Sequence, residues 1–339
     1  MFGYYRIFLS LCVVFQHLCQ MPGNNFSGWY AVFSFYILSG YLMTFVLNEN
    51  YGFHWDGLRR YFTNRTLRIY PTLWAVILFS LPFVAYLPIS DFHRNIYLPT
   101  SAYDWLRNLT LIDLRIPNPR LIPPTWSLFV EVVFYIAIGL IFARKKWITF
   151  LWFFASVAFT AYLVYSGADK EYRYFSIPAS SVAFSSGAIL YYLRKIQIPG
   201  WFTPAIIAAH ALNLLYWHLV PEGRFLEGFY LNVVLSAALI FSLSKLRPTA
   251  IDKVAGDLAY PVFLCHWIIA ALINYYFEIN KGATLFIISI PPVLLFSFIL
   301  HAQVEKKTNA IRDRVKNQTF QPAQSQSSSY PNRLPDLPA

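Results

Sequence analysis

Two polar residues, Arg6 and His17, stand in the first hydrophobic stretch of the chain, residues 3–21. They are eleven positions apart, which on a helix is within about 20° of three whole turns, so both side chains share one face. The helical rise puts His17 about 16.5 Å beyond Arg6, roughly half of a hydrocarbon core. Arginine stays charged and can bind an anion, whereas histidine titrates near neutrality and can act as a general base. The alternative is that Arg6 is an interfacial anchor and His17 a hydrogen-bonded packing residue.

A carboxylate, Glu131, lies well inside the apolar segment PPTWSLFVEVVFY. Placing it in a membrane helix costs about 2.5–3.5 kcal/mol, by analogy with aspartate. Ser127, Glu131 and Tyr135 are spaced i, i+4, i+8 and form one polar stripe, which must face protein or water. A structural ion pair is one explanation of Glu131. A functional role is the default expectation for an intramembrane carboxylate.

The segment RRYFTNRTLRIYP adds a group of cations. Arg65 and Arg68 are i, i+3 neighbours, so both can face one anion at the inner membrane surface. Arg59 and Arg60 fit simple membrane anchors. Together with the first helix, these residues predict a buried site with arginines at a cytoplasmic mouth, a histidine at depth and a carboxylate in the wall. Such a site suits a long donor molecule with an anionic head group that enters from the cytosol. These residues alone do not identify that donor.

Two further segments carry polar residues at helical positions. In FYILSGYLM, Gly40 favours close helix packing, and the functional alternative is that Ser39 and Gly40 line a cavity beside the first helix. In GDLAYPVFLCHW, Asp257 is predicted to be a helix N-cap. His266 in the same segment either lines that cavity or is a satisfied core histidine.

The composition predicts a polytopic integral membrane protein. Hydrophobic residues make up 57% of the 339 residues and charged residues 13%, against about 25% charged in ordinary soluble domains. The fold is predicted to be all-α, with about ten transmembrane helices. They fall near residues 4–22, 29–47, 71–89, 125–143, 147–166, 176–193, 201–219, 229–244, 259–277 and 284–303.

The distribution of charge predicts the topology. An N-terminus inside the cell places most of the 27 Lys and Arg residues on the inner side, so both termini are predicted to be cytoplasmic. The net charge of +11 is then explained mainly by basic residues on the inner side of the membrane. No nucleic acid partner is expected. Residues 48–70 are predicted to form an inner loop, and residues 90–124 an outer loop that caps a cavity.

The chain divides into a membrane domain, residues 1–310, and a largely disordered cytoplasmic tail, residues 311–339, because its end is rich in Gln, Ser and Pro. Cys12, Cys19 and Cys265 lie in apolar stretches and fit small packing residues. Their spacing offers no metal site, and no metal is expected.

The same stretches resemble the acyltransferase 3 family of membrane acyltransferases across residues 4–310. The resemblance rests on Arg6-x10-His17, FYILSGYL, RTLRIYP, PPTWSLFVEVVFY, GDLAYPVFLCH and the closing VEKK. It implies a protein of the bacterial inner membrane that moves an acyl group, usually acetyl from acetyl-coenzyme A. The implied acceptor is a cell-surface glycan or a lipid-linked glycan, with polysaccharide-assembly proteins as candidate partners.

The resemblance also implies roles for individual residues. His17 becomes the catalytic histidine and Glu131 a second catalytic candidate, while Arg6 would contact the phosphates of coenzyme A. The remaining carried-over positions, which support the site or bind the donor, are Arg65, Arg68, Trp126, Ser127 and Tyr135. The sequence departs from the family at Gly3 and Phe33, where many relatives have an acidic residue.

Two other classes of function stay open at this stage. A proton-coupled transporter or flippase would use Glu131 and His17 as a proton relay without acyl chemistry. A membrane scaffold for polysaccharide export would need neither Arg6 nor His17. Within the acyltransferase hypothesis, an acetyl or another short acyl group is compatible with these residues. Direct transfer and a relay through an acyl-histidine also both remain open.

Overall fold

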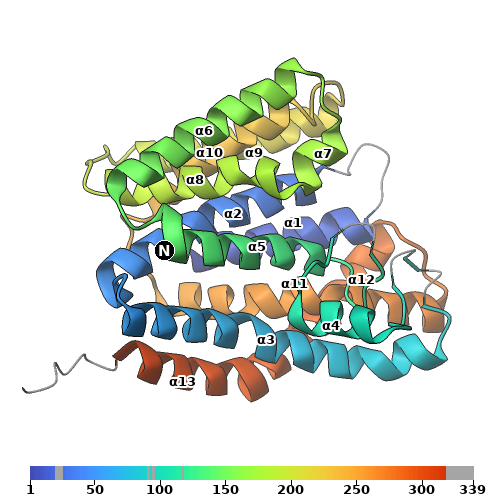
Figure 1. The fold of residues 1–339 in the computed structure, drawn as a ribbon. Helices are drawn as coiled ribbons and strands as arrows, with labels where there is room; N and C mark the ends of the chain where they lie inside the picture. Colours follow the sequence, from blue (N-terminus) through green and yellow to red (C-terminus); the bar gives the residue numbers. More distant parts are fainter. Residues whose placement is uncertain (20–25, 90–91, 94–95, 116–117, 318–339) are drawn as a thin grey trace, which may run out of the picture.

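The computed structural model describes residues 1–19, 26–89, 92–93, 96–115 and 118–317, and all regular structure in these residues is helical (Figure 1). The α-helices are α1 Gly3–Leu18, α2 Ser27–Val46, α3 Trp55–Tyr86, α4 Ala102–Thr110, α5 Thr125–Ala137, α6 Lys146–Tyr165, α7 Lys170–Phe175, α8 Ile177–Leu193, α9 Phe202–Leu219, α10 Glu227–Leu243, α11 Ala250–Phe277, α12 Ala283–Leu300 and α13 Lys306–Asn317. Three π-helical segments extend them: η1 Leu47–Tyr51, η3 Ile138–Phe142 and η4 His301–Glu305.

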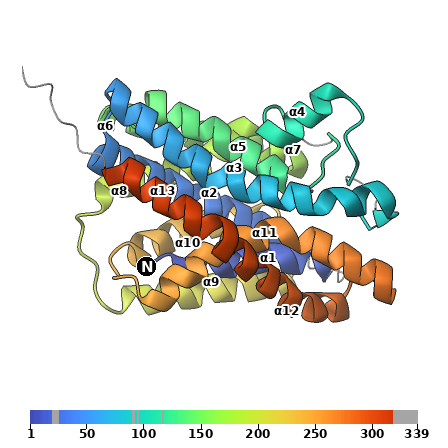
Figure 2. The same cartoon turned by 90° about the horizontal axis from the view of Figure 1, so that it is seen from below.

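The bundle is organised around its first two helices. α1 packs against α11 and α2, and α2 packs against α8. Figures 1 and 2 show α1 and α2 inside the molecule, with α3 and α13 along one side and α6 to α10 on the other. Arg6 and His17 therefore sit on a helix that packs against α2, α11 and α12.

The predicted all-α membrane fold is confirmed. In the described part of the chain, six helical segments are long and apolar enough to cross a membrane. Each of the ten predicted spans overlaps a helix, but the number that crosses the bilayer and the orientation of the termini stay predictions.

One predicted boundary was wrong. The segment predicted as an inner loop, residues 48–70, is mostly helix, because α3 begins at Trp55 and continues through Pro71 to Tyr86. α13 packs along this part of α3, where Arg312 of α13 donates a hydrogen bond to the Asn64 side chain. α13 extends to Asn317, and residues 318–339 lie outside the described residues, so the predicted division into a membrane domain and a tail stays a prediction.

The contact between α2 and α8 depends on glycine. A Cβ atom added to Gly40 of α2 would lie 2.0 Å from the carbonyl oxygen of Phe184, and one added to Gly187 of α8 would lie 1.8 Å from that of Ile37. The two backbones thus approach too closely for any side chain at these positions, as small residues permit in membrane helices. The packing role expected for Gly40 is confirmed, and its neighbour Ser39 faces the site described below.

Replacing Gly40 with alanine is expected to destabilise the protein by about 1–3 kcal/mol, because the added methyl group forces α2 and α8 apart. Thermal unfolding in detergent should show a lower Tm. Gly200→Ala is the control, since a Cβ atom there meets nothing within 4 Å. Equal Tm values for the two variants would contradict this packing.

Candidate functional site

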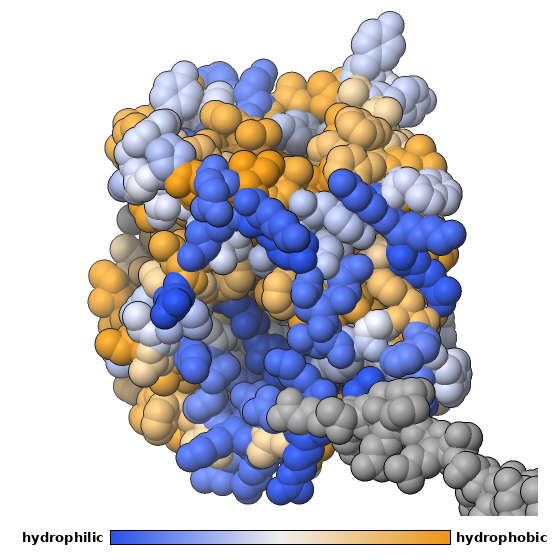
Figure 3. Space-filling view, turned by 90° about the vertical axis from the view of Figure 1, so that its left-hand side faces the viewer, coloured by the Kyte–Doolittle hydropathy of each residue, from blue (hydrophilic) through white to orange (hydrophobic). Residues whose placement is uncertain are grey.

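A cavity of about 280 Å³ opens between α1, α2, α3, α5, α11 and α13 near the N-terminal end of the bundle. It adjoins a second hollow of about 570 Å³, with Arg6, Leu42 and Asp257 lining both. Figure 3 looks onto this end of the molecule and shows a hollow with hydrophilic side chains at its floor. The cavity is therefore open to polar ligands from this end.

Four guanidinium groups line the cavity: those of Arg6, Arg65, Arg68 and Arg312. The sequence predicted the first three at the mouth of one site, with Arg65 and Arg68 facing one anion, and the structure brings all three to one cavity. Arg68 lies 3.9 Å from the buried carboxylate of Glu305. The other three have no carboxylate within ion-pair distance among the residues described.

Two nitrogen atoms in this group have no protein partner. Nε of Arg65 and Nη2 of Arg68 are buried and donate no hydrogen bond within the described structure. Buried donors without partners cost about 1–3 kcal/mol each, and more when charged. An anionic ligand in the cavity would satisfy them, so the arrangement fits phosphate or carboxylate groups.

Glu131 forms one wall of the cavity, together with Ser127 and Tyr135. The predicted polar stripe on α5 thus faces the cavity. Its carboxylate accepts a hydrogen bond from the Tyr135 hydroxyl at 2.5 Å and a short one from the Ser39 hydroxyl. The partners that hold this carboxylate are hydroxyl donors, so the ion-pair explanation of Glu131 has no support here.

His17 does not line this cavity. It borders a separate, small pocket that also contacts Gln16 and Trp126. The spacing argument placed Arg6 and His17 on one face of α1, and both do face α11, but the sequence could not show that side chains divide the space between them. In the described part of the chain no hydrogen bond joins Glu131 to His17, and the catalytic roles predicted for these two residues stay predictions.

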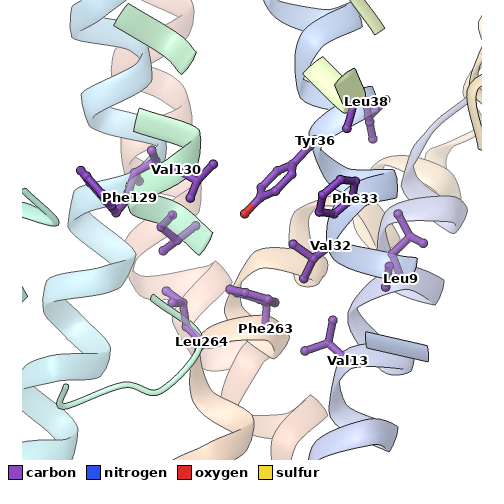
Figure 4. Close-up of a cluster of buried hydrophobic side chains, with 14 of the residues drawn as sticks. Leu9, Val13, Val32, Phe33, Tyr36, Leu38, Phe129, Val130, Phe263 and Leu264 are labelled. Carbon is purple, nitrogen blue, oxygen red and sulfur yellow. The ribbon is translucent and has the colours of Figure 1, made fainter. Parts of the chain in front are cut away.

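Val32 and Phe263 separate the two spaces. Both residues line the arginine cavity and the His17 pocket. Figure 4 shows their side chains between Tyr36, which lines the cavity, and Val13, which lines the pocket. Two apolar side chains, one from α2 and one from α11, thus form the partition.

The hydrogen bonds of His17 fix which of its nitrogens is free. Nδ1 of His266 lies 3.2 Å from the carbonyl oxygen of Val262, which can only accept, so this nitrogen carries a proton and donates. Nε2 of the neutral His266 ring is then an acceptor, and Nδ1 of His17, at 3.0 Å, donates to it. The remaining nitrogen, Nε2 of His17, holds a lone pair and can take a proton.

His266 therefore acts as the positioning partner of His17, in the way that a second group orients the base in many catalytic sites. The two imidazole rings are nearly parallel, with an interplanar angle of 8° and centroids 5.3 Å apart, as an edge-to-edge hydrogen bond requires. On the far side, the Trp267 ring lies 4.7 Å from that of His17, and Nζ of Lys281 lies 5.3 Å from the Trp267 centroid. Burial lowers the pKa of Lys281 to about 8. Aromatic and cationic side chains close this side of the pair.

Sequence reasoning missed Arg312 and misplaced Asp257. Arg312 belongs to α13, in a segment assigned to the tail, and its Nε donates to the Asn64 side chain at 3.1 Å. Asp257 is not an N-cap: α11 begins at Ala250 after Thr249, whose hydroxyl caps it, and Asp257 lines the cavity. A helix start two turns earlier could have been recognised from the Thr-Ala-Ile-Asp segment.

Comparisons with known proteins agree with this architecture. The profile of a family described as "Acyltransferase domain", acyltransferase 3, matches residues 3–302. An uncharacterized protein of Aquifex aeolicus (strain VF5) is 24% identical over 209 residues, which is 56% of this chain and 89% of that protein. No solved structure matches the chain significantly.

Proposed function

Because the chain belongs to the acyltransferase 3 family, we propose that it is a membrane O-acyltransferase that moves an acyl group, in the first instance acetyl, from acyl-coenzyme A to a hydroxyl of an exported polysaccharide. The observation that carries the proposal is the order of groups along α1. An arginine cavity open to one end of the bundle is followed by a histidine with a free Nε2 in the adjoining pocket. We place the protein in the bacterial inner membrane with both termini in the cytoplasm.

The cavity supports a phosphorylated donor. Coenzyme A carries phosphate groups at one end and a thioester at the other. Arg6, Arg65 and Arg68 would bind the phosphates through charge-assisted hydrogen bonds. The pantetheine arm would then extend along α1 toward His17, which lies about 16.5 Å further along the helix. For the thioester to arrive there, Val32 and Phe263 must move apart.

His17 would act as a general base in the transfer step. The acceptor oxygen attacks the thioester carbonyl carbon, so a C–O bond forms and the C–S bond breaks. The hydroxyl proton passes to Nε2 of His17 and then to the departing thiolate sulfur, which gives the ester and the free thiol. The hydrogen bond from Nδ1 of His17 to His266 would hold the ring in place. An acyl-histidine relay would use the same nitrogen as nucleophile.

The transporter hypothesis finds less support in the geometry. A proton relay needs a chain of hydrogen bonds from Glu131 to His17. The carboxylate is instead held by Ser39 and Tyr135 in the arginine cavity, and His17 bonds to His266 in its own pocket. A scaffold needs no anionic ligand in the cavity, so the scaffold hypothesis does not explain why donors of Arg65 and Arg68 are buried there without partners.

Release of free thiol separates these functions. We would incubate the purified protein in nanodiscs of neutral lipid with acetyl-coenzyme A and polysaccharide from the cells that make it. An acyltransferase releases coenzyme A only when the acceptor is present. A transporter or scaffold releases none, and that result would overturn the proposal.

Arg312→Ala is expected to raise the KM for acetyl-coenzyme A about tenfold, since one charge-assisted hydrogen bond to the donor is lost. Arg314→Ala is the matched control, because Arg314 is exposed on the same helix and does not line the cavity. Acetyl-pantetheine, which has no phosphate groups, should be used equally well by both variants. An unchanged KM for acetyl-coenzyme A in Arg312→Ala would remove Arg312 from the donor site.

A further inference from the structure

A third space shares Trp126 with the His17 pocket and lies beside α7, which Figure 1 shows at the end of the bundle away from the N-terminus. It is a groove of about 520 Å³ between the start of α5 and the short helix α7. The groove is lined by Trp126 and Phe129 from α5, and by Asp169, Glu171, Tyr172 and Phe175 from α7 and its N-cap.

The groove shares a lining residue with the His17 pocket, and that pocket shares lining residues with the arginine cavity. Trp126 lines both the groove and the His17 pocket. The next residue, Ser127, lines both the His17 pocket and the arginine cavity. The first turn of α5 thus contacts three spaces in series, with the His17 pocket in the middle. A ligand in the groove would contact Trp126, the residue that the groove shares with the His17 pocket.

The walls of the groove combine aromatic rings with hydrogen-bond acceptors. The ring of Trp126 packs edge-on against that of Phe175, with centroids 4.7 Å apart, so these two rings hold each other in place. Tyr172 is 46% exposed, which leaves its ring available to a ligand. Rigid aromatic faces with a few polar groups are typical of small-molecule sites, and they match the apolar C–H faces of sugar rings.

The carboxylates favour a hydroxyl-bearing ligand without negative charge. Oδ1 of Asp169 accepts the backbone N–H of Tyr172 at 2.7 Å as a helix cap. Glu171 is exposed and makes no ion pair within the described residues. The lining cation, Arg115, is engaged with Asp113 at 2.8 Å. The free acceptors suit sugar hydroxyls, whereas an acidic glycan would be repelled.

We infer that this groove binds a neutral saccharide unit of the acceptor glycan and presents a hydroxyl to His17 past Trp126. The inference rests on the proposed function, because it assigns the acceptor side of the same reaction. It predicts that donor and acceptor occupy opposite ends of the bundle and meet at one histidine.

Tyr172→Ala and Glu171→Gln test the groove. Each is expected to raise the KM for neutral oligosaccharides about tenfold. Tyr172→Ala removes a ring on which a sugar can pack, and Glu171→Gln removes a charged hydrogen-bond acceptor. The KM for acetyl-coenzyme A should change much less. The probes are the neutral and acidic oligosaccharide fractions from the polysaccharide of the cells that make the protein. Tyr165→Ala is the matched control, since Tyr165 is 91% exposed at the end of α6 and lies outside the groove lining.

A second measurement separates failure of the groove from failure of the proposed function. Saturation-transfer NMR without donor should detect the neutral oligosaccharides on the wild type and lose them in Tyr172→Ala. Saccharide binding that depends on Tyr172, without any thiol release, would support the groove and overturn acyl transfer. Acyl transfer with an unchanged acceptor KM in both variants, or transfer to the acidic fraction alone, would overturn the groove.

Discussion

Replacing His17 with alanine is expected to lower acyl transfer by about 10²–10⁴-fold, the contribution of a well-placed general base. The physical reason is that Nε2 of His17 is the one nitrogen of the His17–His266 pair with a free lone pair. The effect should appear in kcat, because the substitution removes no side chain from the arginine cavity or from the groove between α5 and α7. The rate of thiol release with saturating acetyl-coenzyme A and acceptor measures it.

His218→Ala is the control for this experiment, since His218 is exposed at the end of α9, away from the described pockets. Both variants should insert into membranes and give one symmetric peak in size-exclusion chromatography. Transfer by His17→Ala at the rate of His218→Ala would show that the base is another group.

Replacing Arg6 with alanine is expected to raise the KM for acetyl-coenzyme A about 10- to 150-fold. This range corresponds to the roughly 1.5–3 kcal/mol of a hydrogen bond between charged groups. Arg6 lines both the cavity and the adjoining hollow, so a donor that enters from this end passes it. Arg6→Lys should recover part of the affinity, because lysine keeps the charge but not the planar fork.

Arg59→Ala serves as the control, because Arg59 is exposed on α3 and does not line the cavity. Titration of labelled acetyl-coenzyme A onto protein in neutral nanodiscs measures the affinity apart from turnover. If Arg6→Ala and Arg59→Ala bound the donor equally, the phosphates would have to lie elsewhere.

Helical periodicity made it possible to predict which polar residues of one helix share a face. Residues eleven apart on a helix share a face, and Arg6 and His17 do face the same neighbour, α11. The i, i+4 spacing likewise placed Glu131 and Tyr135 on the same wall of one cavity. Both inferences concern a single helix, whose geometry is local and fixed.

The rest depends on contacts between distant segments. The partner of His17 is 249 positions away, and a lone histidine in an apolar span gives no sign of which helix it meets. Arg312 became part of the site because α13 packs along α3. Val32 and Phe263 are ordinary apolar residues in sequence, and they form the partition because α2 and α11 bring them between the two spaces.

Transfer across a sealed membrane tests the central claim most directly. The protein would be reconstituted in one orientation into liposomes, with radiolabelled acetyl-coenzyme A on the side of the arginine cavity and polysaccharide on the other. The account predicts label on the polysaccharide across the intact bilayer, and none with His17→Ala. Label that appears only when donor and acceptor share one side would contradict it.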